Sequence, residues 1–295
     1  PLDKGANLFA HSLLSESGVQ LLIGSDMQGS DNSNADKSGA AVKKLNADSS
    51  PIAEGSLTLS FTGVNNTYTV ERVLDPLAMP FIEDHCIAGN PVLPTVCAIQ
   101  WMRETAQRLC GQPVCVQDYK LLKGIIFDTD EPQVLTLTLT QTESGLNALI
   151  ASRMQNADSN SVLRPQYQAK LVNHSQLENA SNTLPSSVSQ AKQGASEAGI
   201  ISTDTELYSN GSLFHGPRLQ GIKQVLIADD QQLVCKVELP QINPNDCLSF
   251  APQLILGGSQ AFAEDLLLQA MLVWARIKHD AASLPSSIGE LTTYA

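Results

Sequence analysis

Two ionisable side chains in apolar surroundings are the first candidates for chemistry, and His85 is one of them. It lies in DHCIAGNPVLP, residues 84–94, where a turn glycine and a proline follow the imidazole just before an apolar segment. Gly89 permits backbone conformations that other residues avoid, and Pro94 suits the first turn of a helix. Free amides at a helix start can stabilise negative charge on a carbonyl oxygen. We predict that His85 is a general base, although a lone histidine is more often a structural hydrogen-bonding group.

Asp265 is the second candidate, in the segment AEDLLLQAML. A carboxylate in an apolar helix costs several kcal/mol if it is buried without a partner, so the chain must expose it, neutralise it or pair it. Gln269 lies four residues later, on the same helix face, where its amide can hydrogen-bond the carboxyl group. The alternative is that Glu264 and Asp265 occupy the first turns of the helix, where negative charge complements the macrodipole. Both interpretations stay open on these residues alone.

A third segment, LFHGPRLQGI at residues 213–222, places His215, Gly216 and Pro217 in a tight turn ahead of a strand. On its own this segment indicates a turn and nothing more.

The elements that must position these residues fall into two similar blocks. Alternating apolar and polar residues predict strands in the first block, and a helical spacing of apolar residues predicts a long helix between them. The second block has strands followed by a helix that is apolar nearly all round, which predicts a helix wrapped by other structure. The expected strands are 56–64, 67–74, 134–142, 146–154, 223–229 and 232–239, and the expected helices are 95–109 and 259–278.

Two polar segments divide the chain. Residues 24–50 are rich in Gly, Ser, Asn and Asp, and a similar composition recurs at 173–199. Such segments bury too little apolar surface to offset the entropy of ordering. We therefore predict a flexible segment at 1–50, a first module at 51–172, a linker at 173–199 and a second module at 200–295.

Composition excludes several classes of function. The net charge of −12 disfavours a nucleic-acid partner, because affinity for phosphates comes from basic patches. The longest apolar run is too short to span a membrane. Six cysteines without C-x-x-C pairs, and the lack of a signal peptide at the start, predict reduced thiols in a cytoplasmic protein. The first residue is not Met, which predicts a fragment of a longer protein.

Known catalytic patterns of other classes are missing from the sequence. The segment GGSQA is not the G-x-S-x-G of a hydrolase, no H-E-x-x-H or paired Cys/His cluster predicts zinc, and no G-x-G-x-x-G predicts a dinucleotide site.

Taken together, the three segments resemble a known family. HCIAGNPVLP fits H-x-x-x-G-x-x-x-x-P, DLLLQ fits D-x-x-x-Q, and HGPRLQGI fits (Y/H)-G-P-x-(F/L)-Q-G-I, in the order seen in dehydratase domains of polyketide synthases. The resemblance extends from about Gly55 to LPSSIGEL near the C-terminus. The segment GGSQAFAEDLLLQAMLVWARIK looks closer to the similar domains of polyunsaturated fatty acid synthases.

This resemblance implies an α+β fold, the double hotdog, in which two antiparallel sheets each wrap around a long central helix and share one active site. It implies that His85 removes a C2 proton from a 3-hydroxyacyl thioester and that protonated Asp265 assists the departing hydroxyl, giving a trans-2-enoyl product. Backbone amides near Gly89 would polarise the thioester carbonyl, and Gln269 would orient the acid.

The remaining expectations concern the tunnel and the partners. By the resemblance, His215, Gly216 and Pro217 line an acyl tunnel, and no metal or organic cofactor is needed. The substrate would be carried on the phosphopantetheine of an acyl carrier protein, beside other domains of a multidomain synthase, and a homodimer is left open. The chain departs from the family pattern after Pro94, where Thr95 replaces a common Gly, and at Leu213 and Leu219, which replace common aromatic residues. These departures bear on the tunnel width and on the preferred acyl length.

Two other functions fit the same residues. One is a cyclase of the product-template type, which uses the same fold and a His/Asp pair on poly-keto chains. The other is a non-catalytic module that holds acyl chains or builds the synthase dimer. A scaffold has no reason to bury a carboxyl group in an apolar helix, which disfavours the second alternative.

Overall fold

A computed structural model describes residues 58–62, 67–111, 113–155, 161–173, 199–230, 232–239 and 255–291. The flexible segment predicted at 1–50 lies outside these residues, as does nearly all of the linker predicted at 173–199. The proposed division of the chain into modules therefore stays a prediction.

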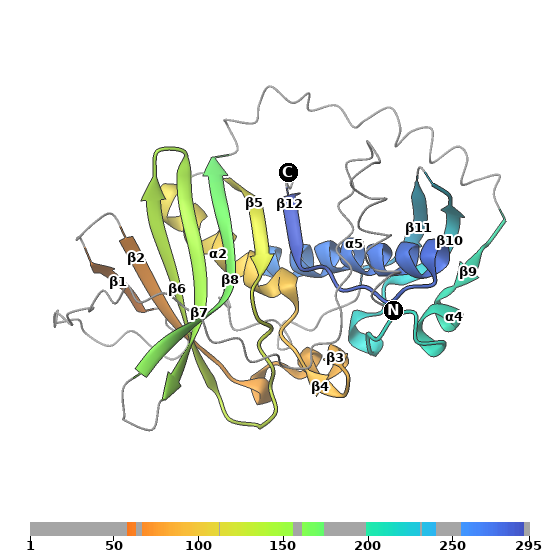
Figure 1. The fold of residues 1–295 in the computed structure, drawn as a ribbon, viewed down its shortest axis with the longest axis horizontal. Coiled ribbons are helices and arrows are strands. Elements are labelled where there is room, and N and C mark those ends of the chain that lie inside the picture. The colour runs from red at the N-terminus through yellow and green to blue at the C-terminus, as the bar shows by residue number, and fades with distance from the viewer. Residues whose placement is uncertain are drawn as a thin grey trace.

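The larger sheet forms one half of the molecule (Figure 1). Its seven strands are all antiparallel, in the order β1-β2-β6-β7-β8-β5-β12. Apolar and polar residues alternate along β2 and β6, so each presents one face to the core. The strands are β1 (Thr58–Thr62), β2 (Thr67–Leu74), β5 (Val114–Leu121), β6 (Gln133–Thr142), β7 (Gly145–Gln155), β8 (Ser161–Asn173) and β12 (Ser287–Leu291).

Helix α2 (Thr95–Cys110) packs against this sheet, with contacts to β5, β7 and β8. Pro94 is its N-cap, and Gly111 ends it in the left-handed conformation with φ 67°. Its buried face includes Val96, Ile99, Met102 and Ala106, which are at most 1% exposed. The helix predicted at residues 95–109 is confirmed.

A smaller antiparallel sheet forms the other half, in the order β11-β10-β9. The strands are β9 (Ser202–Thr203), β10 (Ile222–Ala228) and β11 (Leu233–Val237), and the short helix α4 (Asp204–Ser209) follows β9. The long helix α5 (Ile255–His279) packs against β10 and β11. It begins four residues before the predicted position. Much of α5 is buried, as expected for a helix wrapped by other structure, but Leu267 is 59% exposed and Ile277 is 39% exposed.

Short elements lie where the two halves meet. The 3₁₀ helices η1 (Pro76–Ala78) and η2 (Pro80–Asp84) lead into a small hairpin of β3 (Cys86–Ile87) and β4 (Asn90–Pro91). Opposite them is η4 (Pro217–Leu219), which contacts η2. None of the helices in the described ranges is long and apolar enough to cross a membrane.

Two features join the halves. Helices α2 and α5 contact each other. Strand β12, which follows α5 in the chain, pairs with β5 of the larger sheet (Figure 1). The architecture is therefore two antiparallel sheets, each carrying a long helix, with the loops before α2 and β10 facing one another.

Candidate active site

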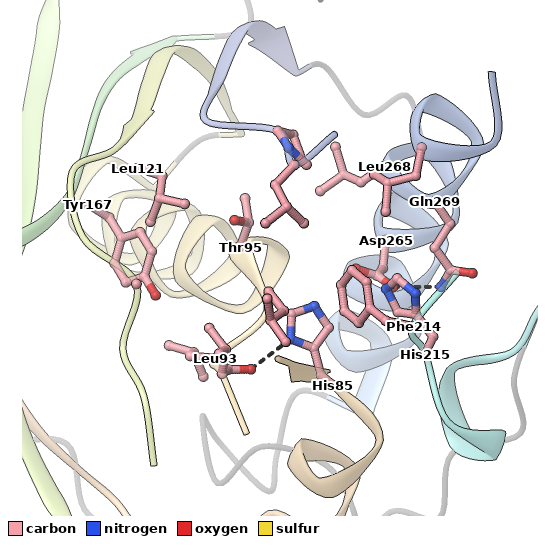
Figure 2. A pocket seen from close by; sticks show the side chains of 16 residues that line it. His85, Leu93, Thr95, Leu121, Tyr167, Phe214, His215, Asp265, Leu268 and Gln269 are labelled. Atoms are coloured by element: carbon pink, nitrogen blue, oxygen red, sulfur yellow. Dashed lines mark hydrogen bonds and ion pairs between the residues drawn. The ribbon is translucent and has the colours of Figure 1, made fainter. Parts of the chain in front are cut away.

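A largely apolar cavity opens where the halves meet. Its wall takes Leu93, Leu121 and Tyr167 from the first half and Phe214, Leu268 and Leu272 from the second (Figure 2). Ionisable side chains on this wall are His85, His215 and Asp265, which come from separate segments of the chain. The structure thus brings together the imidazole and the carboxyl group that the sequence singled out, with a second imidazole beside them.

His85 is held at the end of η2 by its surroundings. The carbonyl oxygen of Val92 can only accept a hydrogen bond, so the ring nitrogen Nδ1, 2.8 Å away, donates to it. This bond leaves Nε2 with a free lone pair. Burial lowers the pKa of His85 to about 4, so the imidazole is neutral near pH 7.

Asp265 lies in the middle of α5 and is 4% exposed. Burial raises its pKa to about 6, while a hydrogen bond from Gln269 acts in the opposite direction. The macrodipole interpretation was wrong, because α5 begins at Ile255 and the first turn holds no acidic residue. The carboxyl group is therefore a buried acid that keeps its proton more readily than an exposed aspartate does.

Gln269 orients this carboxyl group through fixed hydrogen bonds. Its Nε2 donates to Oδ2 of Asp265 at 2.8 Å and to the carbonyl oxygen of Leu219 at 2.9 Å. Its Oε1 accepts a hydrogen bond of 2.7 Å from the hydroxyl of Tyr208. Because these partners lie on different elements, the amide cannot rotate without losing them. Tyr208 has no sequence signal that could have marked it, since its contact depends on how α4 packs against α5.

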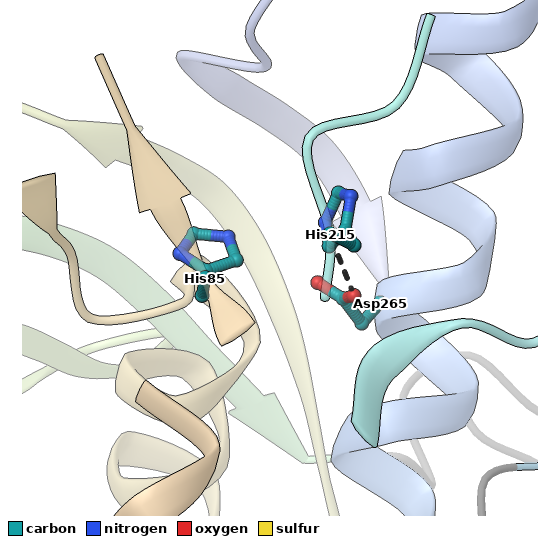
Figure 3. Close-up of side chains that lie close together, drawn as sticks. All are labelled: His85, His215 and Asp265. Atoms are coloured by element: carbon teal, nitrogen blue, oxygen red, sulfur yellow. Dashed lines mark ion pairs between the residues drawn. The ribbon is translucent and has the colours of Figure 1, made fainter. Parts of the chain in front are cut away.

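His215 completes the polar part of the cavity. Its Nε2 lies 3.6 Å from Oδ2 of Asp265 (Figure 3). Its ring stacks on Phe214 at a centroid distance of 4.2 Å. Burial and the neighbouring His85 lower the pKa of His215 to about 3, so the contact with Asp265 is not a charged pair at neutral pH. Its Nδ1 is buried and has no hydrogen-bond partner among the described residues.

The turn that carries His215 is docked on the segment before His85. The amide of Gly216 donates to the carbonyl oxygen of Asp84 at 2.7 Å, and Arg218 forms a 3.0 Å ion pair with the Asp84 carboxylate. A Cβ on Gly216 would overlap with the Asp84 side chain, so only glycine fits this contact. The His-Gly-Pro segment, which looked like a simple turn, is thus the contact that sets the two imidazoles side by side.

The other predicted residues lie around the cavity rather than in its wall. Gly89, with φ 82°, is in the exposed turn of the β3–β4 hairpin. Pro94 caps α2 and is buried, and the next residue, Thr95, does line the cavity. Gly216 and Pro217 follow His215 in the chain and do not line the cavity, and Gly216 is bonded to Asp84.

Sequence reasoning missed a buried ion pair beside Asp265. Arg103 on α2 donates to both carboxylate oxygens of Glu264 on α5, at 2.6 and 2.7 Å, and both side chains are less than 10% exposed. The two residues are 161 positions apart, so no local pattern links them. The pair joins the helix that carries Asp265 to the helix that follows His85.

Comparisons with known proteins agree with this architecture. Residues 59–153 match the family model of the polyketide synthase dehydratase domain. A curated relative is a polyunsaturated fatty acid synthase subunit from a Thraustochytrium species, which is 29% identical over 230 residues. That match covers 77% of this chain but 8% of the relative, so the chain spans a small part of the relative's length.

Solved structures show the same fold. The dehydratase domain of PpsC from Mycobacterium tuberculosis matches with a TM-score of 0.61 and 18% identity, over 83% of each chain. The dehydratase domain of the CurF module of curacin polyketide synthase matches with a TM-score of 0.60 and 15% identity, over 80% of each chain. Two further matches are inactive mutants of CurK dehydratase, with TM-scores of 0.61 and 0.59 and 16% identity. One has a histidine replaced by phenylalanine, and the other has an aspartate replaced by asparagine. They cover 82% and 80% of this chain and 81% and 80% of the CurK chains.

These matches confirm the resemblance to polyketide synthase dehydratase domains and to a polyunsaturated fatty acid synthase, and they confirm the double hotdog.

Proposed function

We propose that this chain is a hydro-lyase that removes water from a 3-hydroxyacyl thioester and releases a trans-2-enoyl thioester. The observation that carries the proposal is the meeting of a neutral imidazole, His85, and a raised-pKa carboxyl group, Asp265, in one apolar cavity. Dehydration of this kind needs a base for the C2 proton and an acid for the C3 hydroxyl. Groups whose surroundings favour those two protonation states suit the two roles.

The reaction can be followed atom by atom. Nε2 of His85 takes a proton from C2, the C2–H electrons form the C2=C3 double bond, and the C3–O bond breaks. Asp265 gives its proton to the leaving hydroxyl, which departs as water. The enzyme is then left with an imidazolium and a carboxylate, and transfer of a proton from one to the other restores the starting state.

The thioester carbonyl needs stabilisation when negative charge develops on its oxygen. Gly89 was the expected location of the amides that supply it, but Gly89 is in an exposed turn. The first turn of α2 is better placed, because Thr95 there lines the cavity and the first amides of a helix lack intrahelical partners. We propose that backbone amides in the first turn of α2 bind the thioester carbonyl oxygen.

The proposed substrate class follows from the cavity and the relatives. An apolar wall accepts a hydrocarbon chain, and this protein is similar to part of a polyunsaturated fatty acid synthase. We propose that the acyl group arrives on the phosphopantetheine of an acyl carrier protein, beside other domains of a multidomain synthase. The proposed chemistry uses side chains of this chain alone and calls for no organic cofactor or metal. The inactive histidine and aspartate mutants of CurK dehydratase support the two catalytic roles by analogy.

The test uses the 295-residue chain and a 3-hydroxyacyl thioester, with enoyl formation followed by mass spectrometry. Wild-type protein should turn over, and His85→Ala and Asp265→Asn should each lose about 10²-fold to 10⁴-fold in kcat, the usual size of an acid–base contribution. His279→Ala and Asp280→Asn are matched controls at the last residue of α5 and just after it, where both side chains are exposed, and should keep activity. Ring formation from a poly-keto substrate alone would favour a cyclase, and equal background rates in all proteins would favour a non-catalytic module.

A further inference from the structure

His85, His215 and Asp265 form a compact cluster of metal-ligand types. One ligand atom from each side chain can be chosen so that all three lie within 4.8 Å of one another, and all three residues are buried (Figure 3). Acid–base dehydration as proposed above requires His85 and Asp265 only. The presence of a second buried imidazole is therefore a feature that the proposed reaction does not explain.

Each side chain of the cluster is prepared to donate a lone pair. Histidines that bind metals usually donate their other ring N–H to a carbonyl or carboxylate, and His85 does so through Nδ1 to Val92. His215 points Nε2 toward Asp265, and its buried Nδ1 lacks a hydrogen-bond partner in the described part of the chain, so no neighbour there fixes the tautomer and Nε2 is free to present its lone pair. Asp265 is oriented by Gln269, as ligating carboxylates usually are by a neighbouring donor.

The spacing is close to that of a real site. Ligand atoms about 2.0–2.1 Å from a tetrahedral zinc ion lie about 3.3 Å from each other. Nε2 of His215 and Oδ2 of Asp265 are already 3.6 Å apart. The widest separation in the cluster must close by about 1.5 Å, which side-chain rotation can supply where the rings border a cavity.

We propose that His85, His215 and Asp265 bind a divalent transition-metal ion of the zinc class, with three protein ligands and one open position. Two imidazoles and one carboxylate are a donor set that zinc accepts, whereas magnesium and calcium prefer oxygen ligands only. A bound ion would occupy the lone pair that His85 needs to accept a proton, and it would replace the proton on the carboxyl group of Asp265. The ion is therefore an inhibitor, and this consequence, unlike binding itself, rests on the proposed function.

Binding is tested first without any substrate. The full chain, free of a histidine tag, is titrated with ZnCl₂ by calorimetry, and CoCl₂ is added separately as an absorbance probe of ligand geometry. One ion should bind the wild type, and His215→Gln and Asp265→Asn should each weaken binding at least tenfold, since loss of even a supporting partner costs about 10-fold to 100-fold. His279→Ala replaces an exposed imidazole and should bind as the wild type does.

Two controls guard this result. Cys86 is next to His85 in the chain, so Cys86→Ser must bind zinc as the wild type does, and cobalt must show no sulfur charge-transfer band. Melting curves without metal show whether each variant is folded. Zinc affinity that is unchanged in both folded ligand variants, or lost in Cys86→Ser, would overturn the proposal.

Activity separates this proposal from the proposed function. Zinc at concentrations that saturate the calorimetric site should inhibit dehydration, and a chelator should restore it. A protein that dehydrates the thioester but binds no zinc overturns the metal site alone. A protein that binds zinc through these residues but dehydrates nothing supports the metal site and overturns the proposed function.

Discussion

His85 and His215 pair with one another in an isolated antiparallel bridge, although they lie in distant segments of the chain. Their ring centroids lie 5.4 Å apart, and the amide of Gly216 bonds to the carbonyl oxygen of Asp84 next to the bridge. A backbone contact therefore sets the distance between the two halves at the cavity. The positions of His85 and Asp265 depend on this contact as much as on their own helices and loops.

The pH dependence of dehydration should be bell-shaped. The active form has His85 neutral, which requires a pH above about 4, and Asp265 protonated, which requires a pH below about 6. Above the upper limb, kcat/KM should fall about tenfold per pH unit, since one proton is lost. His215 and Cys97, which also face this acid, stay uncharged through that range. The measurement is kcat/KM across both limbs with a chelator present, and a rate that stays flat above the pKa of Asp265 would contradict its assignment as the acid.

Gln269→Leu should move the upper limb of this profile. The hydrogen bond from Gln269 lowers the pKa of Asp265, so its loss should raise that pKa and shift the limb to higher pH. The rate at the optimum should also fall about tenfold or more, because the acid is no longer oriented. Tyr208→Phe removes one hydrogen bond to Gln269 and should have the same effect in weaker form. A fall in rate with an unmoved limb would show that Gln269 has a structural role only.

Gly216→Ala should damage both stability and activity. The new Cβ would overlap with the Asp84 side chain, and relieving the overlap must push apart the segments that carry the two histidines. We expect a loss of about 1–3 kcal/mol in the free energy of unfolding, as for other overpacked positions. Denaturant unfolding measures it.

The control for this change is Gly289→Ala in β12, where an added Cβ meets nothing within 4 Å. Adding Asp84→Ala to Gly216→Ala removes the overlapping carboxyl group, although the Cβ of residue 84 stays, and should recover part of the lost stability. A Gly216→Ala protein as stable and active as Gly289→Ala would show that the contact with Asp84 is dispensable.

Arg103→Met should destabilise the fold strongly. It removes the bidentate partner of Glu264 at a buried position, a change that typically costs about 3–5 kcal/mol. The double variant Arg103→Met/Glu264→Leu removes both charges and should recover most of that loss. The exposed pair of Arg153 and Glu71 is the matched control, and Arg153→Met should change the free energy of unfolding by less than about 1 kcal/mol. Equal losses at both pairs, in urea unfolding, would contradict this account.

Much of this arrangement was predictable from local patterns. The spacing of apolar residues predicted α2 and α5, and the alternation along TYTVERVL predicted β2 at the observed bounds. A carboxyl group four residues before a glutamine in an apolar helix made Asp265 a candidate, and the resemblance of three segments to the dehydratase domains then favoured the catalytic interpretation. Each of these patterns lies within one segment of the chain, so a single sequence is enough to detect it.

Long-range contacts left no such signal. The pairing of Arg103 with Glu264, and of Asp84 with Gly216, joins residues from distant parts of the chain, and no local pattern marks them as partners. The expectation that amides near Gly89 would polarise the carbonyl also rested on a local pattern with two possible meanings. A glycine with positive φ is needed equally by an exposed hairpin turn and by a loop that cradles a substrate, and the sequence cannot tell them apart.

The position of β12 in the chain sets a limit on when the cavity can be complete during synthesis. Leu284 and Pro285 border the cavity, and the strand after them fills the edge beside β5. During synthesis, the larger sheet has an open edge beside β5 until residues 284–291 have left the ribosome. Until then the cavity also lacks part of its wall. The cavity is therefore completed by residues that follow both α2 and α5 in the chain.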